Sequence, residues 1–118
     1  MRLFFAINFD EKVKDYLSEV QALVRSSALK GNYTLYDNFH LTLRFLGEFP
    51  ESDVDIFCDC LDELATSAKP FKIKIGDIGS FNRKDKHIVY VDVLENKEDL
   101  YKLAKKLNEI IDNHIEVE

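Results

Sequence analysis

The run NFHLTLRFLGE, residues 38–48, carries polar side chains at every second position of an otherwise apolar segment. His40, Thr42 and Arg44 alternate there with Leu41, Leu43 and Phe45. This alternation is typical of a β-strand with one face on a core, and it places the polar side chains on the other face at intervals of about 6.6 Å. A histidine, a threonine and an arginine are therefore expected in a row along one side of a rigid strand.

These three side-chain types suit reactions at a phosphoryl group. Imidazole, with an unperturbed pKa of about 6.5, gives or takes a proton near neutral pH. A threonine hydroxyl donates a hydrogen bond to an anionic oxygen, and an arginine adds charge complementarity toward phosphate. A lone histidine at a strand edge is more often structural, and threonine is an ordinary strand former, so the H-x-T pattern alone leaves both interpretations open.

The spacing of apolar residues predicts the elements that must position this strand. Further strands are expected at 2–9, 33–36, 71–75 and 87–93, and from residue 114 onward. The first of them is apolar on both faces and is expected to be buried on both. Helices are expected where apolar residues recur at three and four positions, over 13–24, 54–68 and 97–111.

Local signals predict where these elements begin and end. Asp10 and Asn96 are N-cap candidates, and Ser52 with Asp55 resembles a capping box. Residues 76–86 contain two glycines and a basic end, and a loop is expected there. The order β-α-β(β)-α-β-β-α-β has no linker, so the prediction for residues 1–118 is a single α+β domain of antiparallel strands with helices on one face.

Composition narrows the class of function. The formal net charge of −6 argues against a protein that grips duplex nucleic acid by bulk charge, but not against an enzyme that takes one phosphate group at a time. Cys58 and Cys60 point in different directions on a helix, so neither a disulfide between them nor a zinc site is expected. No apolar run approaches the ~20 residues of a membrane span, and no signal peptide is evident, so we expect a cytoplasmic protein without membrane association.

Four stretches in succession resemble one known family. MRLFFAINFDEKVKDYL, NFHLTLRFLGE, PFKIKIGDIGSF and HIVYVDV are similar to segments of the two-histidine phosphoesterases, and more narrowly of the LigT-like RNA 2',3'-cyclic phosphodiesterases, also called 2'-5' RNA ligases. The resemblance covers nearly the whole chain, and HLTLRFLGE is its most specific part. It implies a bilobal α+β fold of antiparallel sheets with outer helices, in which each half supplies one H-x-T motif to a cleft.

The resemblance also implies a reaction. Family members open a terminal 2',3'-cyclic phosphate on RNA to leave a 2'-phosphate, without a metal or a cofactor. Carried over by motif, His40 would be the general acid that protonates the departing 3'-oxygen, and Thr42 would hold a phosphate oxygen. Arg44 is the best further contact with substrate. Phe81 and Arg83, near the basic end of the predicted loop, could stack a base and attract phosphate.

The sequence departs from the family pattern in its second motif, whose histidine would act as general base on water. His87 is expected to be an ordinary strand-end residue. His114 would share a strand face with Glu116 and Glu118, but Glu116 stands where threonine is needed, and a carboxylate repels phosphate. His114 also continues the apolar helical face that precedes it. The offset from the third helix predicts the counterpart histidine beyond Glu118, so the chain is expected to correspond to the N-terminal two-thirds of a family member.

Several functions remain open on this basis. The first is an RNA 2',3'-cyclic phosphodiesterase, and the second is a relative that acts on other cyclic or 2'-5'-linked nucleotides. The third is a catalytically incomplete fragment or RNA-end-binding module of the same fold. The fourth is an unrelated ferredoxin-like interaction domain. Open sheet edges, if the terminal strands are absent, predict a homodimer.

Overall fold

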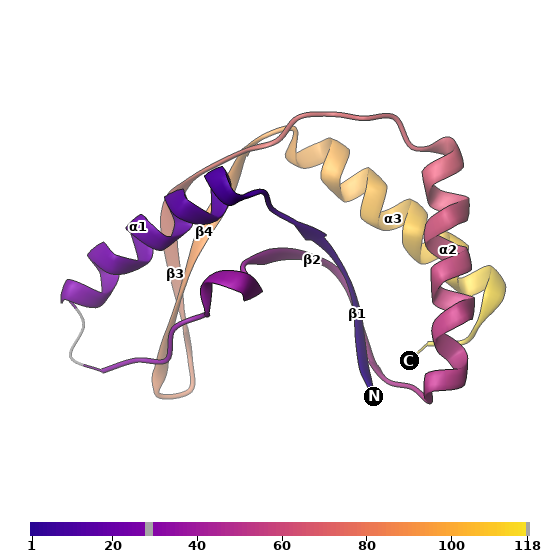
Figure 1. Cartoon of the computed structure of the whole chain (residues 1–118), viewed down its shortest axis with the longest axis horizontal. Coiled ribbons are helices and arrows are strands. Elements are labelled where there is room, and N and C mark those ends of the chain that lie inside the picture. The colour runs from indigo at the N-terminus through magenta and orange to yellow at the C-terminus, as the bar shows by residue number, and fades with distance from the viewer. Residues whose placement is uncertain (28–29, 118) are drawn as a thin grey trace. The chain divides into compact units, whose positions relative to one another are not determined.

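The computed structural model describes residues 1–27 and 30–117. Its helices and strands, labelled in Figure 1, are β1 (Arg2–Asn8), α1 (Glu11–Ser27), β2 (His40–Glu48), α2 (Val54–Ser67), β3 (Lys74–Arg83), β4 (Lys86–Glu95) and α3 (Lys97–His114). Two 3₁₀ turns, at Tyr36–Asn38 and Glu51–Asp53, lead into β2 and α2. The predicted α+β class is confirmed.

The strands form two two-stranded sheets, β1 with β2 and β3 with β4. Strand β1 is tied to the end of β2 by reciprocal bonds: the Met1 ammonium donates to the Phe49 carbonyl at 2.9 Å, and the Phe49 amide donates to the Met1 carbonyl at 3.0 Å. Strands β3 and β4 form an antiparallel hairpin that closes at the pair Arg83↔Lys86.

The chain divides into two compact units, Phe4–Phe45 and Met1–Leu3 with Leu46–Glu118. In the first unit, Asp10 caps α1 as predicted, because its Oδ1 accepts a bond of 3.0 Å from the Val13 amide. The Tyr36 hydroxyl donates to Asp15 at 2.7 Å, which ties the segment before β2 to α1.

The second unit contains the packed pair α2–α3. Apolar residues at helical spacing bury one face of each helix against the other, and Cys60, Leu107 and Ile111 are 0–1% exposed. Cys58, on the same helix as Cys60, is exposed, so both thiols remain free as predicted. A hydrogen bond of 2.7 Å between His114 Nε2 and the Glu63 carboxylate joins α3 to α2 at the surface.

The predicted loop over residues 76–86 is wrong for most of its length, because β3 continues to Arg83. A Cβ built at Gly79 would lie 2.4 Å from the Tyr90 hydroxyl, so this glycine makes room for a ring from β4. The pairing register shifts between Gly76 and Ile78, where Asp77 adopts φ 54°. The glycines therefore mark an irregular strand, and the turn is confined to residues 84–85.

Other boundaries differ from the sequence predictions as well. No strand forms at 33–36, since Gln21 and Tyr36 bond this segment to α1. The strand expected at 71–75 begins only at Lys74. The strand expected from residue 114 is absent from 114–117, because α3 continues through His114, and Glu118 lies outside the described residues.

The predicted capping interactions of the second and third helices do not form. Helix α2 begins after Asp53, which makes no side-chain cap bond, so the Ser52–Asp55 capping box is wrong. Asn96 does precede α3, but in the left-handed region at φ 62°, and its amide donates to the Lys72 carbonyl instead of capping the helix. Burial of both faces of β1 is also wrong, since Phe5 is 6% exposed but Phe4 is 47% exposed.

Candidate active site on strand β2

The imidazole of His40 is held by a backbone carbonyl. Nδ1 lies 2.6 Å from the Asn38 carbonyl oxygen. A carbonyl oxygen only accepts hydrogen bonds, so Nδ1 must carry the proton in this contact. The other nitrogen, Nε2, is therefore the one that can gain or lose a proton while the ring keeps its place.

Nε2 of His40 lies 3.1 Å from the Thr42 hydroxyl oxygen. When the imidazole is neutral, Nε2 accepts this bond and the threonine hydroxyl donates. When it is an imidazolium, Nε2 donates, either to Thr42 or to an incoming oxygen. The predicted pair is thus brought together on one face of β2, with Nε2 of the imidazole beside the threonine hydroxyl.

The ring of Phe4, on β1, covers one face of the imidazole. The two ring centroids are 5.0 Å apart with an interplanar angle of 26°, which is a stacked arrangement. His40 and Thr42 are both exposed, so solvent and ligands reach them. The stack restricts rotation of the imidazole without covering its Nε2 edge.

Arg44 lies two residues farther along β2 and is half-buried. The in-and-out alternation shifts by one residue at this point, because Phe45 is 53% exposed whereas Leu46 is 7% exposed. The predicted inward position of Phe45 is therefore wrong. Contact between Arg44 and a substrate remains a prediction.

Phe81 and Arg83 lie at the end of β3, beside the hairpin turn. The Phe81 ring is 52% exposed and is tilted by 43° against Tyr90, with centroids 6.1 Å apart. Arg83 is exposed as well. They are available for binding at the tip of the β3–β4 hairpin, and their role in binding substrate stays a prediction.

The other two histidines have structural surroundings. His87 lies near the start of β4, opposite Asn82 on β3. His114 is the last residue of α3, and its Nε2 lies 2.7 Å from the Glu63 carboxylate. This hydrogen bond joins α3 to α2. His114 lies in the helix, in line with its place after the apolar helical face.

Two residues of this site were not identified from the sequence. Phe4 was assigned to a buried strand, and only its place beside β2 reveals the stack on His40. Asn38 acts through its backbone carbonyl, so its residue type carries no signal of this role.

Within residues 1–27 and 30–117, no three of the His, Cys, Asp and Glu side chains are arranged to hold a metal ion. A search of the same residues for a helix long and apolar enough to cross a membrane finds none.

Comparison with known proteins places these residues in a family. Residues 7–90 match the family described as LigT like Phosphoesterase. A Thermotoga maritima protein named RNA 2',3'-cyclic phosphodiesterase is 30% identical over 114 residues, which cover 97% of this chain and 61% of that protein. An Archaeoglobus fulgidus protein of the same name is 34% identical over 114 residues, covering 92% and 60% respectively.

A solved structure agrees with the sequence matches. The crystal structure of the Thermus thermophilus protein TT0787 superposes with a TM-score of 0.82 at 28% identity, over 96% of this chain and 61% of that one. The chain thus spans about 61% of the length of these relatives. The alternative of an unrelated ferredoxin-like domain is wrong. His40 and Thr42 fall inside the matched residues, and the chain belongs to the LigT-like phosphoesterase family.

Proposed function

We propose that this protein is an RNA 2',3'-cyclic phosphodiesterase that leaves a 2'-phosphate. The observation that carries the proposal is the geometry of His40, with Nδ1 fixed on the Asn38 carbonyl and Nε2 beside Thr42. In the reaction, the oxygen of water attacks phosphorus, the bond from phosphorus to the 3'-oxygen breaks, and the 3'-oxygen gains a proton. The names of the matched relatives support this choice of substrate.

His40 would supply the proton to the departing 3'-oxygen. As an imidazolium it donates from Nε2, while the bond from Nδ1–H to the Asn38 carbonyl stabilises the positive charge. After the transfer, Nε2 accepts a bond from the Thr42 hydroxyl in the neutral ring. Before it, the same hydroxyl is available to donate to a phosphate oxygen. The Thr42 hydroxyl would therefore bond to a phosphate oxygen while His40 is charged, and to Nε2 once His40 is neutral.

The proton of the attacking water needs a separate base. The 118 residues contain a single H-x-T sequence, and a positioned acid or base contributes roughly 10²–10⁴-fold to a rate. We therefore expect slow turnover by this chain, with solvent taking the water proton. The single motif also favours a second candidate function, binding of the RNA end without turnover.

The test is a metal-free turnover assay, with a chelator, on a short RNA that ends in a 2',3'-cyclic phosphate. The parent should form a 2'-phosphate end, and His40→Ala should lose at least about 10²-fold in rate. His87→Ala is the matched control, because His87 is an exposed strand histidine outside the site. Equal rates for parent and His40→Ala would contradict the assignment.

Two further outcomes of these assays would favour the alternative functions, an RNA-end-binding module or a relative with another substrate. No product from the parent, together with binding of 2'-phosphate RNA that His40→Ala weakens, would establish the RNA-end-binding module. Faster turnover of a 3',5'-cyclic or 2'-5'-linked nucleotide than of the RNA end would assign the chain to a relative with another substrate.

A homodimer and a cytoplasmic location are also part of the proposal. In the described part of the chain each sheet has two strands, so each strand has one edge without a sheet partner. Such edges favour pairing with another chain. Sedimentation should show a concentration-dependent dimer, and a monomer at all concentrations would contradict it. Cell fractionation would test the location.

A further inference from the structure

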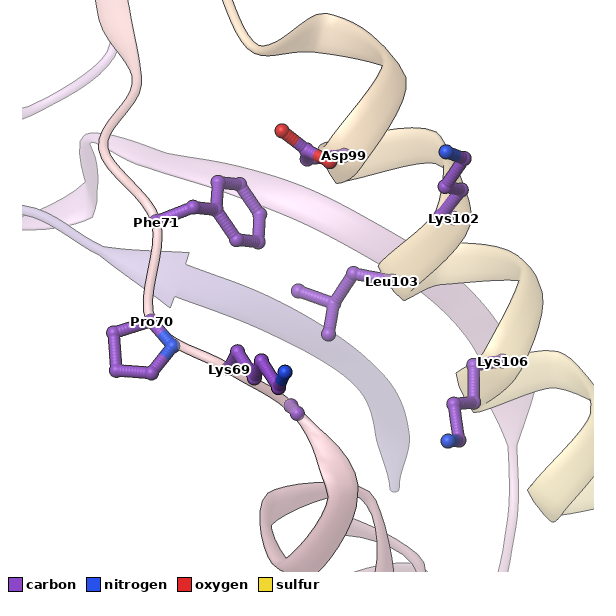
Figure 2. A pocket seen from close by; sticks show the side chains of 8 residues that line it. Lys69, Pro70, Phe71, Asp99, Lys102, Leu103 and Lys106 are labelled. Carbon is purple, nitrogen blue, oxygen red and sulfur yellow. The ribbon is translucent and has the colours of Figure 1, made fainter.

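A second feature outside the His40 site is a surface pocket of about 340 Å³ between the end of α2 and the first half of α3. Its apolar part consists of Ala68, Pro70, Phe71 and Leu103. In Figure 2 the Phe71 ring extends toward α3 and the Leu103 side chain extends back toward it across the pocket. The ring is 37% exposed, so one aromatic surface remains accessible.

Three lysines surround this apolar part, and we call the whole feature the lysine pocket. Lys69 follows α2, and Lys102 and Lys106 project from α3 one helical turn apart. Asp99 lines the pocket too, so three cations face one anion, a local charge of +2. The ion pairs among the described residues involve none of these three lysines.

This local charge is opposite in sign to that of the whole chain, whose formal net charge is −6. Cations beside an exposed aromatic ring are the two components that bind single-stranded nucleic acid: lysines attract phosphates, and the ring stacks a base. The Asp and Glu side chains of an acidic peptide would pair with the lysines, but they offer no flat ring to stack on Phe71.

We propose that the lysine pocket binds single-stranded RNA through its phosphodiester backbone and one base, independently of any cyclic phosphate end. The choice of RNA over another polyanion rests on the proposed function. Phe71 would stack a base, and Lys69, Lys102 and Lys106 would contact phosphates. The protein would then hold its substrate at the RNA chain as well as at the RNA end.

The test measures binding of a fluorescent RNA of roughly ten nucleotides, within the usual site size for single strands, with a 3'-hydroxyl end. Affinity is measured as a function of salt for the parent and for Lys102→Ala with Lys106→Ala. The slope of log K against log salt is negative, and each lost phosphate contact reduces its magnitude by about 0.7. The slope of the double variant should therefore be about 1.4 less steep than that of the parent. Lys105→Ala, on the same helix but outside the pocket, is the matched control and should keep the slope.

A second variant tests the aromatic contact. Phe71→Leu keeps an apolar side chain and removes the ring, and it should weaken RNA binding about 5- to 150-fold at constant slope. Thermal unfolding of each variant confirms that it is folded before binding is compared.

The outcomes are distinguishable from those of the His40 assay. Parent and His40→Ala should bind the 3'-hydroxyl RNA equally, whether or not the parent turns over a cyclic end. An unchanged slope in the double lysine variant would overturn the proposal. So would equal competition by poly-glutamate, which would assign the pocket to acidic peptides.

Discussion

The α2–α3 pair contains most of the buried residues, whereas the unit Phe4–Phe45 contains the candidate site around His40. In the helix pair, Cys60 and Leu107 are 0% exposed, and none of the described buried residues is polar or charged. In Phe4–Phe45, Phe5 is the one described residue below a tenth exposed, and His40 and Thr42 lie at the surface. The comparison indicates that the packed core and the geometry around His40 can be changed separately.

The two regions also differ in what fixes their geometry. Apolar packing orders α2 against α3, through residues that share one face of each helix. Around His40, polar contacts act beside the stacked Phe4 ring. They are the Asn38 carbonyl, the Thr42 hydroxyl and the Tyr36–Asp15 bond. Hydrogen bonds are directional, so they orient an imidazole more narrowly than packing at an exposed position would.

The largest effect on the stability side is expected from Leu107→Ala. Removing a fully buried leucine should lower the free energy of unfolding by about 2–5 kcal/mol, because the cavity it leaves is only partly filled. Urea unfolding measures this, and the rate at which a thiol reagent reaches buried Cys60 should rise with it.

The matched control is Leu23→Ala on α1, where the leucine is 69% exposed and the change should stay within about 0.5 kcal/mol. Turnover per folded molecule should be the same in both variants. A loss of turnover in folded Leu107→Ala would show that the helix core and the His40 site are coupled, and would contradict this comparison.

On the chemical side, Thr42→Val keeps the shape of the side chain and removes the hydroxyl that faces His40 Nε2. We expect turnover or RNA-end binding to fall about 10- to 150-fold, the value of a hydrogen bond to a charged group. Thermal unfolding should change little, since valine favours strands. Thr66→Val on α2, whose hydroxyl bonds only within its helix, is the control and should keep full turnover.

A smaller effect is expected from the bond that ties the segment before β2 to α1. The hydrogen bond to the Asp15 carboxylate raises the pKa of Tyr36 to about 12, since only the neutral phenol donates. A raised pKa means that the contribution to stability is complete below pH 10 and is lost as pH rises through 12.

The melting temperature of the parent should therefore fall more steeply than that of Tyr36→Phe over this alkaline range. Tyr101→Phe, at a tyrosine that is 65% exposed on α3, should follow the parent. Parallel curves for parent and Tyr36→Phe would show that this bond does not help to order the segment.

The smallest effect concerns the start of α3. The hydrogen bond that Lys97 Nζ donates to Asp92 Oδ2, at 3.1 Å, lowers the pKa of Asp92. A lowered pKa gives stability that is present above the ordinary aspartate value, about 3.9, and is lost as pH falls through the folded value. Asp92→Asn should lower the melting temperature at pH 7 but not in strong acid. Asp112→Asn, an exposed aspartate on α3, should have no effect at either pH.

That His40 and Thr42 lie on one side of a strand could be predicted because alternation is a local property. His40 and Thr42 share an exposed strand face for the reason given by their spacing. Gly76 and Gly79 were misassigned to a loop because their role depends on Leu94 and Tyr90 of the opposite strand. The contact with the Asn38 carbonyl could not be predicted, because every residue has a carbonyl and only the folded backbone directs this one toward His40 Nδ1.

The reciprocal bonds between Met1 and Phe49 have a consequence for the order of folding. They join residues 48 positions apart, whereas the β3–β4 hairpin closes across a two-residue turn. Closing a longer loop costs more chain entropy, and hairpins form in about 1–10 μs. The hairpin should therefore assemble early, and the strand that carries His40 should find its partner later. Protection of β2 amides from hydrogen exchange would accordingly appear after that of β4.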